Sequence, residues 1–229
     1  MLIDFLTEAP MITYESESAL FESSAPMIVP MLIWQEDDEL RIEAYEGVQD
    51  IAEEYEARFG RYPFSKAALD WLDEQLAPYC NEYGYFREVQ GKYRWYRQFT
   101  YTYEEKDELI QPSTFRWEGD PNLSGLLLDL DPDWLTYVTV MDGVIVSAAR
   151  VNEYDPDESS PEITVETAVE YRGKGFGVSN VLALSRVLAE NGERAQYVCS
   201  RYNRGSAKLA LKAGFAETGR FYAYTAYKD

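Results

Sequence analysis

The sequence predicts an α/β fold in which a mixed sheet carries helices on its faces, preceded by an N-terminal extension of helices and a hairpin. Two observations support this prediction. From residue 134 onward, β-type and helical patterns alternate in the order β-β-β-α-β-α-β, and before it two stretches place apolar residues at helical spacing. The 229 residues are 46% apolar and 15% aromatic, enough to build the core of one large domain or two small ones.

The N-terminal extension contains two predicted helices and one predicted hairpin. Residues 47–60 place apolar side chains on one stripe with acids opposite, and Ser65 is positioned to cap a second helix that reaches about residue 79. Residues 85–103 are rich in aromatic and β-favouring side chains around Gln90-Gly91, which indicates a hairpin. The polar, turn-rich stretch 111–124 then predicts a boundary between domains at residues 1–120 and 121–229.

The C-terminal part has sharper element signals. Asp142-Gly143 is a strong hairpin turn signal between two apolar runs, and Gly192 and Gly214 lie where helices are expected to end. The predicted strands cover residues 134–141, 144–150, 163–169, 195–200 and 221–227. One helix is expected to follow Gly177 and end at Asn191, and a second to run from Asn203 to Ala213.

Composition excludes several functional classes. The net charge of −20 disfavours binding to nucleic acid or to anionic membranes. The chain has no histidine, which removes Ser-His-Asp catalysis, histidine-ligated zinc and an imidazole base, and Cys80 and Cys199 are too few for a disulfide framework. No signal peptide is readable, and the longest apolar stretch, 25–34, is far shorter than the ~18 residues of a membrane span. We therefore expect a soluble, cytoplasmic protein without a metal site.

The charge is distributed unevenly along the chain. Residues 171–229 hold 10 Lys/Arg and 4 Asp/Glu, a net charge of +6, whereas residues 1–170 hold 11 and 37, a net charge of −26. The basic end is therefore the part expected to bind an anion. The acidic part either attracts a cationic ligand or serves only solubility.

A glycine-rich turn, Arg172-Gly173-Lys174-Gly175-Phe176-Gly177, lies between a predicted strand and a predicted helix. Backbone N–H groups at a helix N-terminus bind anions, and Arg172 and Lys174 add positive charge. Neither common phosphate motif fits, because Val178 takes the place of the third glycine of G-x-G-x-x-G and Gly175 that of the P-loop Ser/Thr. A turn that binds no ligand remains an alternative at this point.

Two segments in sequence order resemble motifs of the GNAT superfamily of N-acyltransferases. Residues 166–177 resemble its acyl-CoA signature, a strand followed by Arg/Gln-x-x-Gly-x-Gly/Ala, in which Arg172, Gly175 and Gly177 fill the pattern. Residues 203–215 resemble its second motif, Asn-x-x-Ala/Ser ending in Gly-Phe. Within the superfamily the combination is similar to the zwittermicin-resistance type of acetyltransferase, and the resemblance covers residues 134–228.

The resemblance implies an acetyl-CoA-dependent N-acetyltransferase with a GNAT-like fold. It implies that the pyrophosphate of CoA is held by the backbone of Arg172, Gly173, Lys174, Gly175, Phe176 and Gly177. It also implies that pantetheine pairs with the backbone of Thr167, Ala168 and Val169 between splayed strands, and that Asn203 and Ser206 border the CoA arm. For Asn203, simple capping of the helix is an equal alternative.

The catalytic groups are less well defined. Many GNAT enzymes carry a tyrosine as general acid seven residues after the motif asparagine, and here that position is Ala210. Tyr222 and Tyr224 on the last strand are possible substitutes. Without histidine, the base is expected to be a carboxylate, and Glu166 and Glu162 alternate onto one face of the strand that leads into the CoA motif. Either could instead be a solvated or ion-paired residue.

The acidic N-terminal part predicts a cationic small-molecule amine as acceptor. Two rival hypotheses remain. The first is a non-catalytic GNAT-like module that binds acyl-CoA or a protein, which Ala210 favours. The second is a structural or interaction domain whose glycine turn binds nothing.

Overall fold

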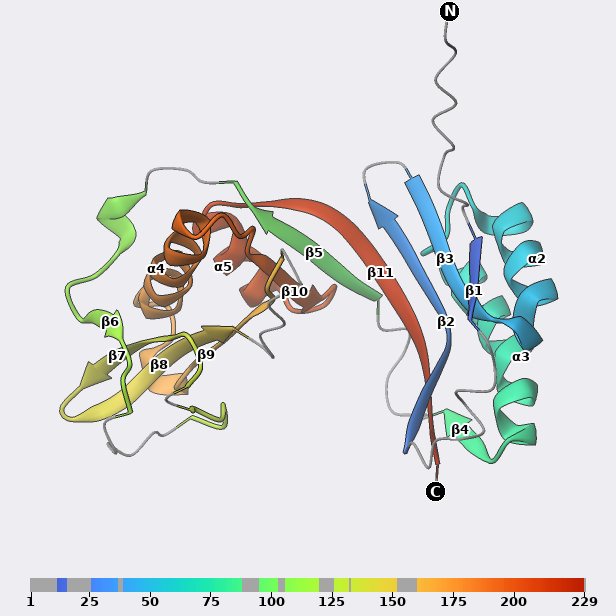
Figure 1. Ribbon diagram of the computed structural model, residues 1–229, viewed down its shortest axis with the longest axis horizontal. Coiled ribbons are helices and arrows are strands. Elements are labelled where there is room, and N and C mark those ends of the chain that lie inside the picture. Colours follow the sequence, from blue (N-terminus) through green and yellow to red (C-terminus); the bar gives the residue numbers. More distant parts are fainter. Residues whose placement is uncertain are drawn as a thin grey trace, which may run out of the picture. The chain divides into compact units, whose positions relative to one another are not determined.

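The computed structural model describes residues 12–15, 26–36, 39–87, 95–102, 106–119, 126–131, 133–151 and 160–228 (Figure 1). It is a mixed α/β structure, as predicted. The chain forms two compact units: unit 1 comprises residues 1–96 and 219–229, and unit 2 comprises residues 97–218. Two strands, β5 (Trp95–Tyr101) and β11 (Phe215–Lys228), run from one unit into the other.

This division differs from the boundary expected between residues 120 and 121. Residues 107–116 pack with the later part of the chain, where Gln111 and Thr114 form hydrogen bonds to Ser179. The end of β11 belongs to unit 1, where it pairs with a strand near the N-terminus. Both contacts join residues far apart in sequence, which local patterns do not reveal.

Unit 1 is a sheet covered on one face by two helices. Its strands follow the order β1-β3-β2-β11, with β4 also paired to β11; β1 and β3 are parallel and the other pairs antiparallel. The elements of unit 1 are β1 (Ile12–Glu15), β2 (Met27–Glu36), β3 (Glu39–Tyr45), a 3-10 turn (Glu46–Val48), α2 (Gln49–Phe59), α3 (Lys66–Glu82) and β4 (Tyr85–Arg87). Both predicted helices are confirmed, and the Ser65 hydroxyl caps α3 by accepting the Ala68 N–H at 3.2 Å.

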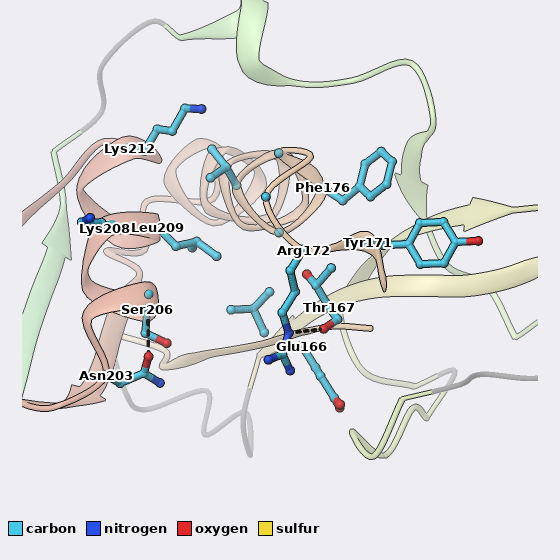
Figure 2. A pocket seen from close by; sticks show the side chains of 16 residues that line it. Glu166, Thr167, Tyr171, Arg172, Phe176, Asn203, Ser206, Lys208, Leu209 and Lys212 are labelled. Carbon is cyan, nitrogen blue, oxygen red and sulfur yellow. Dashed lines mark hydrogen bonds between the residues drawn. The ribbon is translucent and has the colours of Figure 1, made fainter. Parts of the chain in front are cut away.

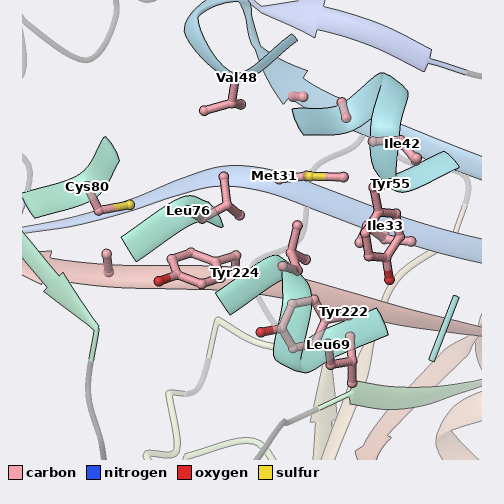
Figure 3. Packing of buried hydrophobic residues seen from close by; sticks show 14 of the residues in the cluster. Met31, Ile33, Ile42, Val48, Tyr55, Leu69, Leu76, Cys80, Tyr222 and Tyr224 are labelled. Atoms are coloured by element: carbon pink, nitrogen blue, oxygen red, sulfur yellow. The ribbon is translucent and has the colours of Figure 1, made fainter. Parts of the chain in front are cut away.

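The core of unit 1 lies between this sheet and its helices (Figure 3). Strands β2 and β11 contribute Met31, Tyr222 and Tyr224, which pack against α2 and α3 side chains such as Tyr55 and Leu76, and all five are fully buried. Burial raises the pKa of the Tyr224 hydroxyl to about 12. These phenols therefore belong to a hydrophobic core.

The hairpin predicted over residues 85–103 is wrong. Residues 85–87 and 95–101 do form strands, but β4 pairs with Ala226–Lys228 of β11, not with β5. The expected turn at Gln90-Gly91 lies outside the described residues. Strands β1, β2, β3 and β6 (Thr114–Arg116) were not predicted from the sequence. Of these, β2 contains Pro30, a residue that is uncommon in a paired strand. The structure accommodates Pro30 at a register shift, where β11 advances from Tyr224 to Ala226 while β2 passes from Met31 to Ile28.

Unit 2 contains a four-stranded antiparallel sheet of order β6-β7-β8-β9, against which α4 packs. Its elements are the end of β5, a 3-10 turn (Asp107–Leu109), β6 (Thr114–Arg116), β7 (Thr136–Met141), β8 (Val144–Val151), β9 (Ile163–Thr167), a 3-10 turn (Val169–Tyr171), α4 (Phe176–Glu190), β10 (Gln196–Ser200), α5 (Arg204–Lys212) and the start of β11. The predicted order β-β-β-α-β-α-β is confirmed. The predicted Asp142-Gly143 turn is also confirmed, with φ of 51° and 79° at its two residues.

Within the described part of the chain, no helix is both long and apolar enough to cross a membrane.

Candidate functional site

A cavity of about 530 Å³ lies in unit 2 between the end of β9, the start of α4 and one face of α5 (Figure 2). Nine residues singled out in the sequence line it: Glu166, Thr167, Arg172, Gly173, Gly175, Phe176, Gly177, Asn203 and Ser206. The lining also includes seven residues to which the sequence assigned no role at the site: Val165, Tyr171, Val178, Gly205, Lys208, Leu209 and Lys212. It does not include Glu162, Ala168, Val169 or Lys174. The two motif segments, about thirty residues apart in sequence, thus meet at one cavity.

The cavity opens where two neighbouring strands separate. Strands β9 and β10 are parallel where they meet, and a single bridge, between Glu162 and Gln196, joins them. There the Gln196 N–H donates to the Pro161 carbonyl at 2.9 Å. Beyond this point the two strands belong to different sheets. Their separation leaves backbone groups of β9 without strand partners on the β10 side.

Strand alternation shows which backbone groups face this gap. The Ala168 N–H donates to the Val146 carbonyl at 2.9 Å, so Ala168 points toward β8 and its N–H is used within the sheet. Pro161 points the other way, toward β10. Since backbone direction alternates along a strand, Val165 and Thr167 also face the gap. Val165, absent from the sequence prediction, is therefore better placed than Ala168 to pair with an extended ligand.

The backbone of the glycine-rich turn lines one side of the cavity. Gly175 adopts φ of 90° and precedes the first turn of α4, whose leading N–H groups have no partner within the helix. A Cβ at Gly175 would lie 2.8 Å from Gln111 Nε2, and one at Gly177 would lie 2.9 Å from Leu209 Cδ1. At these two positions glycine therefore allows close packing against the protein's own side chains, as well as the backbone path of the turn.

Positive charge borders the cavity on two sides. Arg172 lines the cavity at the end of β9, where its Nε donates to the Thr167 carbonyl at 3.0 Å (Figure 2). Lys208 and Lys212, one turn apart on α5, line the opposite wall. The Lys174 ammonium instead lies 4.5 Å from the centre of the Tyr171 ring. Three lining residues are basic and only Glu166 is acidic, so the lining favours an anion.

Asn203 and Ser206 bring the start of α5 to the cavity. The Asn203 Oδ1 accepts the Ser206 N–H at 3.0 Å, so Asn203 caps α5 and also lines the cavity. Behind them, the buried Tyr197 hydroxyl donates to Ser206 Oγ at 3.1 Å. Burial raises the pKa of Tyr197, although its hydrogen bond to Ser206 lowers it. The phenol is therefore protonated at neutral pH and orients the Ser206 hydroxyl.

The two candidate bases occupy different environments on β9. Glu166 lines the cavity, and its Oε2 accepts the Leu128 N–H at 2.7 Å. The other oxygen, Oε1, has no hydrogen-bond partner among the residues that the structure describes. Glu162 lies exposed at the bridge to β10, outside the cavity lining. The geometry therefore favours Glu166 over Glu162 as the group that could accept a proton in the cavity.

Ala210 and the two C-terminal tyrosines do not supply a general acid. Ala210 is fully buried in the core of unit 2, and the neighbouring Leu209 reaches the cavity instead. The suggestion that Tyr222 or Tyr224 substitutes for the missing tyrosine is wrong, because both lie in the core of unit 1 and neither lines the cavity. Their burial raises the pKa of both hydroxyls, with Arg87 lowering it in part.

Cys80 and Cys199 are free, buried thiols. Burial raises the pKa of both, Cys80 to about 12, which makes them poor nucleophiles. Across the ranges that the structure describes, no three Cys, Asp or Glu side chains cluster as metal ligands would.

Comparisons with known proteins find structural similarity to acetyltransferases. A putative GNAT-family acetyltransferase from Novosphingobium aromaticivorans is 15% identical over 63% of this chain and 73% of its own, with a TM-score of 0.48. A GCN5-related N-acetyltransferase from Sphaerobacter thermophilus is 12% identical over 85% and 76%, with a TM-score of 0.45. One from Kribbella flavida is 15% identical over 92% and 91%, with a TM-score of 0.43. No protein-family model and no curated protein matches the sequence.

Proposed function

We propose that this protein is a GNAT-type N-acetyltransferase that moves an acetyl group from acetyl-CoA to a primary amine, of the zwittermicin-resistance type. One observation carries the proposal: both motif segments line the same cavity, at the place where β9 and β10 separate. A glycine turn that bound nothing would have no reason to share a basic cavity with the capped start of α5. We also expect a cytoplasmic location, and neither nucleic acid nor membrane as a partner.

The basic lining and the N–H groups at the start of α4, which have no partner within the helix, support CoA as the ligand. Its diphosphate would face the N–H groups at the start of α4, and Lys208 and Lys212 would add charge along α5. The pantetheine arm would pair with the backbone of Val165 and the N–H of Thr167 in the gap beside β9, since the Thr167 carbonyl already accepts from Arg172, and Asn203 and Ser206 would lie alongside. When bound, acetyl-CoA supplies the thioester that the amine attacks.

Glu166 is proposed as the base that accepts the proton of the amine. An alkylammonium with a pKa near 10 is only about one-thousandth neutral at pH 7, which corresponds to roughly 4 kcal/mol. The Leu128 N–H fixes one carboxylate oxygen, and the other can accept the proton directly or through water. Glu162 remains the weaker candidate for this role.

The acceptor is proposed to be a small cationic amine. This rests on the net charge of −26 over residues 1–170, which attracts cations. An acceptor screen that follows CoA release should favour polyamines and amino sugars. Better turnover of neutral or acidic amines would contradict this part of the proposal.

A second candidate function is a non-catalytic module that binds acyl-CoA. The buried Ala210 favours it, because the position where many GNAT enzymes carry a general acid has no hydroxyl. The two functions are separated by measuring thiol release from acetyl-CoA with an amine panel. Release that depends on both amine and enzyme supports the acetyltransferase, whereas tight binding of CoA without release supports the binding module.

A further inference from the structure

Gln111, which lies 63 residues before Lys174 in the sequence, forms a hydrogen bond to the glycine-rich turn. The Gln111 backbone N–H donates to Ser179 Oγ at 2.7 Å, which anchors Gln111 to a fully buried hydroxyl on the first turn of α4. From this anchor, Gln111 Nε2 donates to the Lys174 carbonyl at 2.9 Å. Gln111 thus spans from the helix to the turn that precedes it, and no motif in the sequence marks it.

This hydrogen bond fixes the direction of one peptide group. In a planar trans peptide, the carbonyl of one residue and the N–H of the next point in opposite directions. With the Lys174 carbonyl directed to Gln111, the Gly175 N–H is directed away from Gln111. Gly175 lines the cavity, whereas Gln111 and Lys174 do not. The direction that leads away from Gln111 therefore leads toward the cavity, and the Gly175 N–H faces it.

The Lys174–Gly175 peptide would have other orientations available without this contact. Gly175, with φ of 90°, places few steric limits on rotation at its side of this peptide. The Lys174 side chain is directed to the Tyr171 ring and does not itself hold the carbonyl. Gln111 is therefore the contact in the described structure that selects this orientation.

We propose that Gln111 is a positioning residue for the acyl carrier: it orients the Lys174–Gly175 peptide so that the Gly175 N–H is presented to the diphosphate. The inference rests on the proposed function, in which that diphosphate belongs to CoA. Gln111 itself does not touch the ligand. Its loss should weaken binding of the carrier without affecting the chemical step.

The test replaces the side chain and leaves the backbone anchor in place. Gln111→Met keeps the length of the side chain but has no donor, and Gln111→Ala removes it. Both variants should bind CoA about ten-fold more weakly in calorimetric titration, because the charge-assisted hydrogen bond from the Gly175 N–H to the diphosphate is lost. KM for acetyl-CoA should rise by the same factor, while kcat and the KM of the amine stay within two-fold of wild type.

Gln49→Ala is the matched control, since Gln49 also donates from its side-chain amide, to Glu53 on α2 of unit 1. It should leave CoA affinity unchanged. Wild-type affinity in both Gln111 variants overturns the inference. So does a loss of kcat equal to the loss of affinity in Gln111→Met, because that pattern indicates general disruption. If the wild-type protein itself fails to bind CoA, the proposed function fails; if it binds and the Gln111 variants match it, only the role of Gln111 fails.

Discussion

Replacing Gly175 by alanine should weaken acetyl-CoA binding far more than it weakens the fold. The residue adopts φ of 90°, a conformation that costs an L-residue about 1–2 kcal/mol. A Cβ there would also lie 2.8 Å from Gln111 Nε2 and displace its hydrogen bond to Lys174, worth about 0.5–1.5 kcal/mol. If the turn relaxes to avoid both costs, about 1.5–3.5 kcal/mol separates it from the binding conformation, and affinity falls roughly 10- to 300-fold.

Gly192→Ala provides the matched control for this prediction. Gly192 lies just beyond the other end of α4, with a similar φ of 85°, and a Cβ there would meet nothing within 4 Å. Gly192→Ala should therefore lower the free energy of unfolding, measured with denaturant, through a similar backbone strain. It should leave the affinity for acetyl-CoA unchanged in calorimetric titration. Equal affinity of Gly175→Ala and wild type would refute the reasoning, as would an equal loss of affinity in both variants.

Three further predictions concern the base, the basic wall and the core. Glu166→Gln should lower kcat at least 100-fold with acetyl-CoA affinity nearly unchanged, whereas Glu162→Gln on the same strand should have a much smaller effect in the same steady-state assay. Lys208→Ala and Lys212→Ala should each weaken acetyl-CoA binding several-fold at low salt, and titrations should show this difference shrinking as salt is raised. Burial raises the pKa of the Cys80 thiol from 9.0 to about 12. The contribution of the protonated thiol to the free energy of unfolding is therefore complete below pH 9 and is lost as pH rises toward 12. In denaturant unfolding from about pH 8 to 11, the free energy of unfolding should fall less steeply for Cys80→Ala than for wild type.

The elements around the cavity were predictable because their signals are local. Asn203 caps α5, Gly192 follows α4, and Asp142-Gly143 forms the turn between β7 and β8, each within a few residues of the pattern that indicated it. The glycine turn between β9 and α4 also lies where the sequence placed it. These features depend on backbone preferences of a few neighbouring residues.

The failures concern pairing between distant segments. Tyr85 has β-forming character, but its partner is Lys228, at the other end of the chain, so the local hairpin was the wrong choice. Strand β2 was not predicted at all, and it contains Pro30 at the point where its register with β11 shifts. Tolerance of a proline at such a point follows from tertiary contacts and has no local signature.

The candidate site shows the same limit. Motif residues such as Gly175 could be identified from order and spacing. Lys208 and Lys212 lie within the segment that resembles the second motif, but the sequence assigned them no role at the site. Which face of α5 meets the cavity depends on how that helix packs. Gln111 lies 63 residues before the carbonyl that it binds, and no sequence pattern links the two.

A crystal structure with acetyl-CoA bound tests the central claim most directly. We expect the diphosphate against the backbone N–H groups between Gly173 and Gly177, pantetheine beside Val165 and Thr167, and the thioester within reach of Glu166. Density for the carrier at any other place, or an empty cavity after soaking with excess acetyl-CoA, would contradict this claim.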